Sequence, residues 1–388
     1  MRSALDTGRG ALPVGLSTLA LVLGLVTSAG GAGAQVRVAD LVFTGGLSME
    51  AYRGKNFSAV TVPVVDSTDH ASAAVGQFGA RGRVVFRDVV GGPYVGLTFD
   101  GGVRQFAAMG FELRDYAPRE WAARVRMDYQ QALRDVGRLG LQASFRGRSV
   151  EDRPPLPLFL QPGYATFRGL GTFEFLPVQG VTFDLEADLE RADYHAPPLL
   201  SQLDLLDRRS GGIELGARTS GDAPWSVRFF TGFRWSRYEH QGTYVAEDPF
   251  RRDRTVNLGA TWSTTGTVLA TMGVEGSVNR SNSIRPEYDA LSVRGELTTA
   301  LPFWDLTASA FSLLTWKSYV HQTEFARLVP GEEADNASVL YLDLVRPLAA
   351  NLDGVLRFGW TRAETDIGDS YYRRFGATFL MNFRPAGF

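Results

Sequence analysis

The stretch from Tyr371 to Phe383 alternates between two kinds of side chain with a period of two. One parity holds Phe375, Ala377, Phe379, Met381 and Phe383, and the other holds Arg374, Gly376, Thr378, Asn382 and Arg384. Because successive side chains of a strand point to opposite faces, this stretch predicts a strand with one apolar and one polar face. A soluble barrel turns its apolar face inward, whereas a barrel in lipid turns it outward.

Segments of this alternating kind recur along the chain. We predict sixteen strands, at 39–52, 75–87, 93–107, 118–130, 137–148, 164–176, 179–192, 211–219, 225–239, 254–265, 267–281, 288–300, 303–317, 338–346, 351–363 and 371–384. No long segment shows the i, i+3, i+4 repeat of an amphipathic helix. The pattern therefore predicts an all-β fold, an antiparallel up-and-down β-barrel of about sixteen strands.

Long and short connections alternate between the predicted strands. The short ones include 88–92, 176–178, 220–224, 265–266 and 301–302, and the long ones include 53–74, 149–163, 193–210, 240–253 and 318–337. Barrels that cross a membrane have short turns at one end and longer loops at the other. An even strand number also places both ends of the chain at the end with the short turns.

The polar faces of the strands decide which face would meet lipid. They hold many charges, and an unpaired charge in a dry core costs several kcal/mol. All seven Trp fall on the apolar parity, and Trp304 and Trp316 are expected at the two ends of one strand, roughly 30 Å apart along the membrane normal. We therefore expect the charged face inside with water and the apolar face against lipid. A secreted two-sheet or propeller protein is the alternative.

The terminal strand also resembles the closing strand of bacterial outer-membrane β-barrels, which commonly ends in Phe. Here the chain ends in Phe388, separated from the alternating stretch by Arg384-Pro385-Ala386-Gly387. The resemblance, to porin-like barrels without a defined subfamily, covers the whole chain after its leader. It implies a location in the cell outer membrane. It also implies outer-membrane lipid, lipopolysaccharide and the barrel-insertion machinery as partners.

Residues 1–34 have the pattern of a secretory signal peptide. Arg2 and Arg9 precede an apolar core at 11–26, and Ala32-Gly33-Ala34 is a small-residue cleavage site. A short buried helix is the alternative. With cleavage after Ala34, residues 35–388 form the barrel, and no room remains before the first strand for a plug domain.

Composition excludes several classes of function. The chain has no Cys, which excludes a disulfide scaffold and thiol catalysis. Its formal net charge of −2 argues against nucleic acid as a partner. After the N-terminal segment, no stretch has the ~18 consecutive apolar residues of a membrane helix.

Charged residues on the polar parity are the candidate functional residues, as a charged lining of the lumen. They are Arg81, Arg83, Arg104, Arg124, Arg126, Arg146, Arg168, Asp184, Glu186, Asp188, Arg228 and Arg234. One interpretation is a water-filled pore with a basic wall and an acidic stripe, whose fixed charge sets ion preference. The other is a charge network that braces the barrel and fills a narrow lumen.

Other motifs give weaker signals. His70, His195, His240 and His321 lie in or beside predicted loops near Asp69, Asp193, Glu239 and Glu324, but without the close spacing of a metal site on one element. Two loops, 153–160 and 197–200, are rich in Pro and Leu, and are expected to pack at the rim or constrict the lumen rather than bind an apolar ligand. No Gly-x-Ser-x-Gly or nucleotide-binding motif appears. We expect no catalytic residue, metal or cofactor.

The sequence thus predicts a passive outer-membrane pore for small polar solutes. Two alternatives stay open. One is a closed structural or polysaccharide-export-associated barrel, and the other is a barrel enzyme that modifies lipid or glycan.

Overall fold

The computed structural model describes residues 35–54, 70–87, 93–109, 119–151, 163–175, 177–178, 180–195, 203–219, 221, 223–243, 247–283, 287–321, 338–364 and 371–385. The strands in these ranges are β1 (Gln35–Gly54), β2 (His70–Arg87), β3 (Tyr94–Met109), β4 (Arg119–Leu133), β5 (Gly137–Glu151), β6 (Gly163–Phe175), β7 (Val181–His195), β8 (Arg208–Thr219), β9 (Trp225–Gly242), β10 (Phe250–Thr264), β11 (Val268–Ser281), β12 (Tyr288–Ala300), β13 (Thr307–Tyr319), β14 (Ser338–Ala349), β15 (Leu352–Glu364) and β16 (Tyr371–Phe383). One short 3-10 helix, η3 (Leu203–Leu206), precedes β8.

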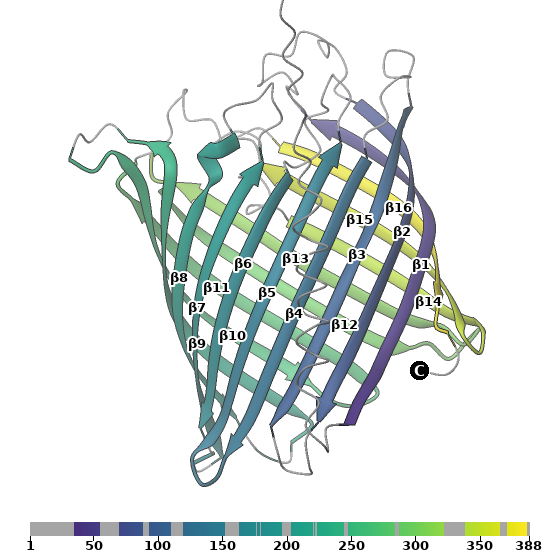
Figure 1. The fold of residues 1–388 in the computed structure, drawn as a ribbon, viewed down its shortest axis with the longest axis horizontal. Coiled ribbons are helices and arrows are strands. Elements are labelled where there is room, and N and C mark those ends of the chain that lie inside the picture. The colour runs from purple at the N-terminus through teal and green to yellow at the C-terminus, as the bar shows by residue number, and fades with distance from the viewer. Residues whose placement is uncertain are drawn as a thin grey trace, which may run out of the picture.

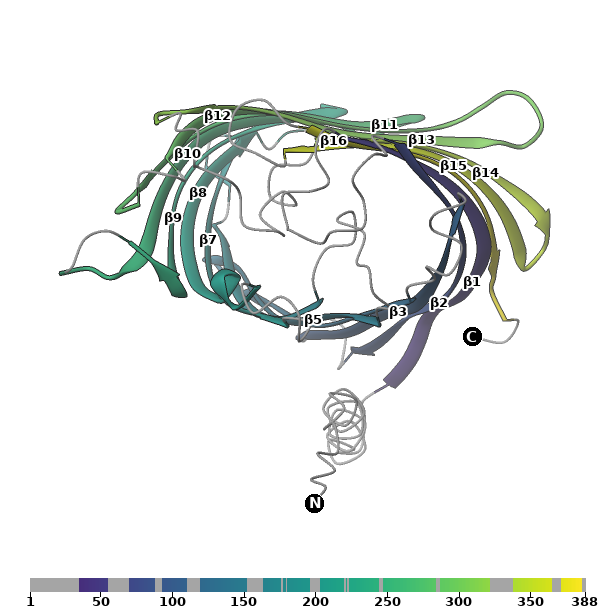
Figure 2. The ribbon, with the colours of Figure 1, turned by 90° about the horizontal axis from the view of Figure 1, so that it is seen from above.

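The sixteen strands form one closed sheet. Each strand pairs in antiparallel fashion with its neighbours in sequence, and β1 pairs with β16 to complete the ring (Figures 1 and 2). Because closure gives every strand two partners, no strand is left as an edge of the sheet, although β13 pairs with β14 only from Thr307 to Leu313. The predicted all-β, up-and-down barrel of about sixteen strands is confirmed.

The connections differ between the two ends of the barrel. At the end where β1 begins, the turns are short, as at 134–136, 265–267 and 350–351 (Figure 1). At the other end the connections are mostly longer, such as the one between β13 and β14. The observed strand bounds therefore agree with the predicted alternation of short and long connections. Apart from 1–34, the segments outside the described residues include the loop stretches 153–160 and 197–200.

The largest delay in a strand start is that of β13. β13 starts at Thr307 rather than at residue 303, because Trp304 and Asp305 have φ of 60° and 51° and form a turn. This left-handed backbone region does not continue into a strand. The prediction that Trp304 and Trp316 lie at the two ends of one strand is therefore wrong. Trp304 is 72% exposed on the turn before that strand.

The two faces of the wall differ as the alternation requires. On one face large apolar side chains are exposed, among them Leu47 (71%), Leu189 (65%) and Leu258 (68%). On the other face, ion pairs skip a strand, such as Arg104 of β3 with Glu50 of β1. Strands two apart are separated by ~10 Å, so side chains meet over an intervening strand where the sheet is concave. The charged face is the inner one, and the apolar face is the outer one.

Within the described residues, no helix is long and apolar enough to cross a membrane.

Candidate functional site: the charged inner wall

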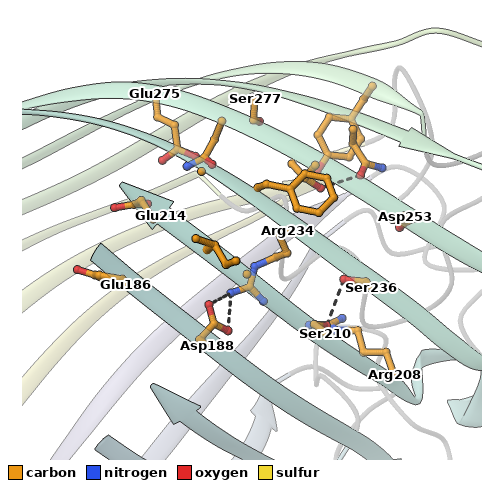
Figure 3. Close-up of a pocket in the computed structure, with 18 of the residues that line it drawn as sticks. Glu186, Asp188, Arg208, Ser210, Glu214, Arg234, Ser236, Asp253, Glu275 and Ser277 are labelled. Atoms are coloured by element: carbon orange, nitrogen blue, oxygen red, sulfur yellow. Dashed lines mark hydrogen bonds and ion pairs between the residues drawn. The ribbon is translucent and has the colours of Figure 1, made fainter. Parts of the chain in front are cut away.

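A cavity of about 460 Å³ opens along the inner wall over β6–β13. Carboxylates from four strands line it, namely Glu186 and Asp188 of β7, Glu214 of β8, Asp253 of β10 and Glu275 of β11. Arg234 of β9 lies among them (Figure 3). The period of two places these side chains on one face, since residues two apart in a strand point the same way. We call β7–β11 the acidic sector of the wall.

Arg228 is the centre of one ion-pair cluster in this sector. Its guanidinium donates two hydrogen bonds to Asp184 and one of 2.9 Å to Glu214, and it lies 3.8 Å from Glu186. The Arg228 and Asp184 side chains are only 17% and 12% exposed. One cation therefore holds three carboxylates that would otherwise repel each other.

Glycines of β8 let these ion pairs form. Gly216 lies in register between Asp184 and Phe230, and a Cβ at this position would meet the Asp184 carboxylate at 2.5 Å and Arg228 Nε at 2.7 Å. Gly212 has the same place between Asp188 and Arg234. A larger residue at either position would fill the space over β8 through which β7 and β9 make contact.

Asp188 is held by cations from two strands. Arg234 of β9 donates bonds of 2.8 and 2.9 Å to its two oxygens, and Arg168 of β6 approaches at 3.4 Å. Arg168 thus connects the acidic sector to the arginine-rich strands before it. The residues that sequence reasoning missed here are the two glycines, whose signal was their recurrence on the inner parity of β8.

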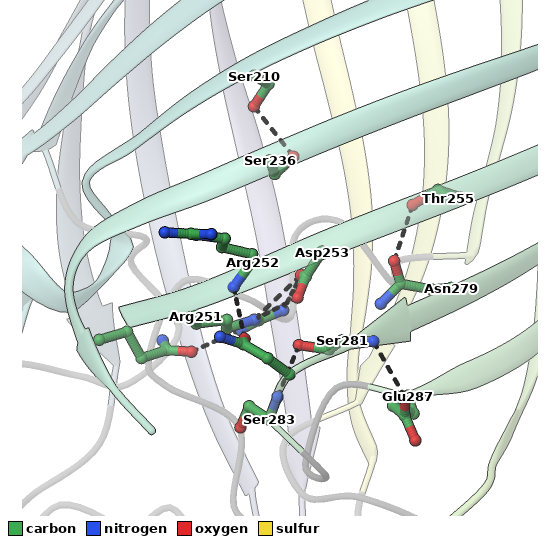
Figure 4. A network of polar contacts seen from close by, with 12 residues as sticks. Ser210, Ser236, Arg251, Arg252, Asp253, Thr255, Asn279, Ser281, Ser283 and Glu287 are labelled. Atoms are coloured by element: carbon green, nitrogen blue, oxygen red, sulfur yellow. Dashed lines mark hydrogen bonds and ion pairs between the residues drawn. The ribbon is translucent and has the colours of Figure 1, made fainter. Parts of the chain in front are cut away.

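Near the long-loop end, polar side chains tie β9, β10 and β11 together (Figure 4). Arg251 donates to Asp253 at 2.6–3.0 Å and to Gln241 at 2.7 Å, and its guanidinium lies 4.2 Å from the Tyr238 ring centroid. Thr255 donates to Asn279 at 2.8 Å. Arg251 and Asp253 are both buried, so this cluster is a rigid part of the wall rather than an exposed charge.

The strands β2–β6 form a basic sector with many arginines on the inner face. Arg104 pairs with Glu50 at 2.5 Å and with Glu120 at 3.6 Å, and Arg148 reaches Glu120 at 2.9 Å. Arg126 pairs with Asp128 at 2.9 Å. In each case a carboxylate on the same strand, on the neighbouring strand or across one intervening strand compensates the positive charge.

Arg81 and Arg83 have weaker partners at the short-turn end of this sector. Arg81 lies 4.0 Å from Asp40, with both side chains about half exposed. Arg83 donates a hydrogen bond to the Tyr94 hydroxyl.

Arg124 and Arg146 differ from the arginines described above. Arg124 and Arg146 are cross-strand partners on β4 and β5, and both are exposed. Neither makes a hydrogen bond or an ion pair within 4 Å with the part of the chain that the structure describes. Like charges directly opposite each other in a sheet repel. On its other side Arg124 is in register with Asp100 of β3, whereas Arg146 is in register with the uncharged Thr166 of β6, so solvation by water favours this pair.

The strands β12–β15 carry a third, more aromatic lining. Phe311 and Tyr341 stack with their centroids 6.2 Å apart. Arg294 lies 5.5 Å from the Phe311 centroid, and Arg357 lies 5.8 Å from the Tyr341 centroid and donates to Asp343 at 2.7 Å. The rings shield the arginine stems while their charged groups stay accessible.

All twelve candidate residues lie on strands and on the inner parity. The structure brings Asp184, Glu186 and Arg228 together, and separately Arg168, Asp188 and Arg234. Arg81, Arg83, Arg104, Arg124, Arg126 and Arg146 spread over β2–β5 without a common cluster.

The histidines contact different carboxylates from those adjacent in sequence. His240 lies 3.7 Å from Asp207 rather than near Glu239, which pairs with Arg209. His321 lies 3.3 Å from Glu287. The side chains of His70 and His195 fall outside the described residues. Among residues with described side chains, no group of three His, Cys, Asp or Glu could hold a metal ion.

Comparison with known proteins finds likeness of structure only. No protein-family model and no curated protein matches the chain. Similar solved structures include OmpF of Salmonella typhi in complex with daunomycin. It has 10% sequence identity and a TM-score of 0.43, and the alignment covers 90% of this chain and 98% of OmpF. OccK7 (OpdD) of Pseudomonas aeruginosa has 11% identity, a TM-score of 0.37, and 92% and 99% coverage. A bacterial polysaccharide outer membrane secretin has 14% identity, a TM-score of 0.38, and 90% and 100% coverage. These similarities concern the fold alone.

Proposed function

We propose that this chain is an outer-membrane barrel that acts as a passive pore for small polar solutes. The observation that carries the proposal is the inner wall, where Arg124 and Arg146 are exposed and face each other on neighbouring strands, an arrangement that favours water inside the barrel. A dry, side-chain-filled interior would leave two like charges unsolvated, at a cost of several kcal/mol. Sixteen strands are also enough to enclose an aqueous channel.

The outer face supports placement in a lipid bilayer. Large apolar side chains that remain exposed all around a soluble barrel would form a patch far larger than soluble monomers carry. Here they extend around the ring, from Leu47 on β1 through Leu189 on β7 and Leu258 on β10 to Phe379 on β16. In a bilayer this face replaces a buried core as the source of apolar stabilisation.

The inner wall presents both signs of charge in different sectors. Arg124 and Arg146 provide positive charge on β4 and β5 without an ion pair within 4 Å in the described residues, and Glu186 and Glu214 provide negative charge as direct neighbours on β7 and β8. A solute that carries both an anionic and a cationic or hydrogen-bonding group can contact both sectors in passing. This arrangement favours polar and zwitterionic solutes over apolar ones.

Single-channel recording in planar bilayers tests the proposal. The protein is extracted in detergent, its folded state is verified by its heat-modifiable mobility on gels, and it is added to one side of the membrane. We expect steady conductance steps, together with liposome leakage that falls as the solute becomes larger. Silence from the verified, folded barrel would contradict a pore. Altered surface polysaccharide on its loss would then indicate a closed, export-associated barrel, and lipid hydrolysis would indicate an enzyme.

A further inference from the structure

Four arginines form a row on the outer face near the long-loop end of the barrel. Arg191 of β7 is in register with Arg209 of β8, Arg209 with Arg237 of β9, and Arg237 with Arg252 of β10. We call these four residues the arginine row. All four are exposed. The row therefore contains three successive like-charged cross-strand pairs, an arrangement that destabilises a sheet unless an anion lies between the charges.

The carboxylates nearby compensate this row only in part. Glu239 accepts from Arg209 at 2.7 Å, and Asp248 lies 3.0 Å from Arg252. Arg191 and Arg237 make no hydrogen bond or ion pair within the described part of the chain, although Asp193 lies two residues from Arg191 on the same face. The two uncompensated guanidinium groups flank Arg209, which belongs to the strand between them.

Directly beyond the row the surface is apolar over β7–β9, while the exposed Arg254 of β10 is in register with Trp235 at its margin. One step further from the long-loop end, Leu189, Gly211 and Trp235 are in register with one another. A Cβ on Gly211 would meet the Trp235 indole at 2.5 Å and Leu189 at 3.0 Å, so these two side chains cover the glycine. Guanidinium groups thus border an apolar surface that includes Trp235. Trp is enriched where a protein surface passes from lipid to water.

We propose that the arginine row binds the phosphate groups of an outer-leaflet glycolipid that carries more than one phosphate. Arg matches phosphate oxygens through a planar fork of N–H donors. The row spans three strand spacings, roughly 14 Å, which is longer than a single phosphate group. A lipid fits better than a free anion, because the acyl chains would lie on the apolar surface around Trp235. The proposal rests on the proposed placement of the outer face in lipid, but not on an open lumen.

Lipid retention by the detergent-solubilised full-length barrel tests this site. The probes are a bis-phosphorylated lipid A, the same glycolipid without its phosphates, phosphatidylglycerol, and inorganic phosphate as a competitor. We expect the bis-phosphorylated lipid to bind most tightly. The variant R191Q/R237Q should weaken this binding about 30-fold, since each arginine near a charged membrane surface contributes ~1 kcal/mol. R191K/R237K should recover part of the loss, because lysine keeps the charge without the fork.

R124Q/R146Q is the matched control, because it also removes two exposed arginines that make no ion pair in the described residues, but from the inner wall. It should retain lipid like the unchanged protein. Equal binding of the phosphorylated and dephosphorylated glycolipids to the unchanged protein would overturn the proposal without any variant. Equal loss in both variants, or full displacement by inorganic phosphate at millimolar concentration, would also overturn it. Conductance recorded on the same preparations tests the pore separately, so the two proposals can fail independently.

Discussion

Replacing Arg124 and Arg146 by Gln should shift the ion selectivity of the barrel towards cations. Both arginines are exposed on the inner wall and make no ion pair within 4 Å with the described residues, although Asp100 is in register with Arg124. Neutralising them removes two positive charges without breaking any ion pair. The folded structure should therefore persist while the electrostatic potential inside the barrel becomes more negative.

The size of this shift follows from Coulomb's law. A unit charge ~10 Å from a passing ion in water contributes about 0.4 kcal/mol, and screening at 0.1 M salt reduces this to about 0.15 kcal/mol. Two charges thus change the energy of a cation and of an anion by about 0.3 kcal/mol each, in opposite directions. The cation-to-anion permeability ratio should rise about threefold at 0.1 M salt. At 1 M salt, where the Debye length is about 3 Å, the change should nearly vanish.

The assay is the reversal potential across a bilayer with a salt gradient. The control is R126Q/D128N, which makes two substitutions on the same strand but removes an ion pair of 2.9 Å and leaves the net charge unchanged. It should leave the reversal potential where it is. An unchanged reversal potential in R124Q/R146Q would show that these arginines do not line a conducting path. An equal shift in the control would show that the effect comes from disturbed structure rather than from charge.

Variants in the acidic sector should shift ion selectivity in the opposite direction. Glu186 and Glu214 are direct cross-strand neighbours, and neutralising both as E186Q/E214Q should shift selectivity towards anions. The same argument predicts a change of similar size, reduced because Arg228 holds part of this negative charge. Shifts of the same sign in the two double variants would refute the assignment of charges to the lumen.

The remaining predictions concern stability, measured by urea unfolding of the barrel in lipid vesicles. Arg228→Gln should lower the free energy of unfolding by about 2 kcal/mol, because it leaves three carboxylates without their cation. Arg294→Gln should cost less than about 1 kcal/mol, because the side chains of its ion pair are 59% and 43% exposed. Equal effects of the two substitutions would refute the difference expected between a part-buried and an exposed ion pair. Gly46→Ala should destabilise by about 1–3 kcal/mol because its Cβ would meet the Phe379 carbonyl oxygen at 2.2 Å, whereas Gly45→Ala, with nothing within 4 Å, should stay within about 0.5 kcal/mol. A Gly46→Ala barrel as stable as the Gly45→Ala barrel would mean that the β1–β16 seam relaxes freely.

The period-two pattern was sufficient to predict the strands and their faces. It reports which side of a sheet each side chain occupies, and in a closed wall every strand obeys the same rule. The strand ends near the long loops were harder to place. β9 continues to Gly242, beyond the predicted end at residue 239, because Gln241 bonds to Arg251 within the sheet, although its polarity resembles that of a loop.

Turn geometry was also hidden from the pattern. Trp304 fits the apolar parity of the strand that follows, but its positive φ places it in the turn. Parity alone cannot distinguish a strand residue from a turn residue. A short turn can keep the alternation of residue types while its side chains no longer alternate between the two faces. An aromatic residue next to Pro302 and Asp305 is a signal that favours a turn.

Charge pairing required the three-dimensional structure. The sequence places Arg124 and Arg126 on the same face, yet only Arg126 has an ion-pair partner, Asp128. The pairs across β8 depend on Gly212 and Gly216, and their partners are more than forty residues apart in sequence. A period of two predicts which side chains share a face, but not which of them approach within hydrogen-bonding distance.

The pairing of β1 with β16 has a consequence for the order of folding. Thr44 donates a hydrogen bond of 2.8 Å to Asn382 over a separation of 338 residues. If this seam formed first, loop closure would cost about 3 kcal/mol more entropy than a hairpin of ~13 residues. The hairpins should therefore assemble first and the seam last. Until then the growing sheet keeps two unpaired edges, which can template the pairing of another chain. The ring thus needs both of its terminal strands before it is safe from aggregation.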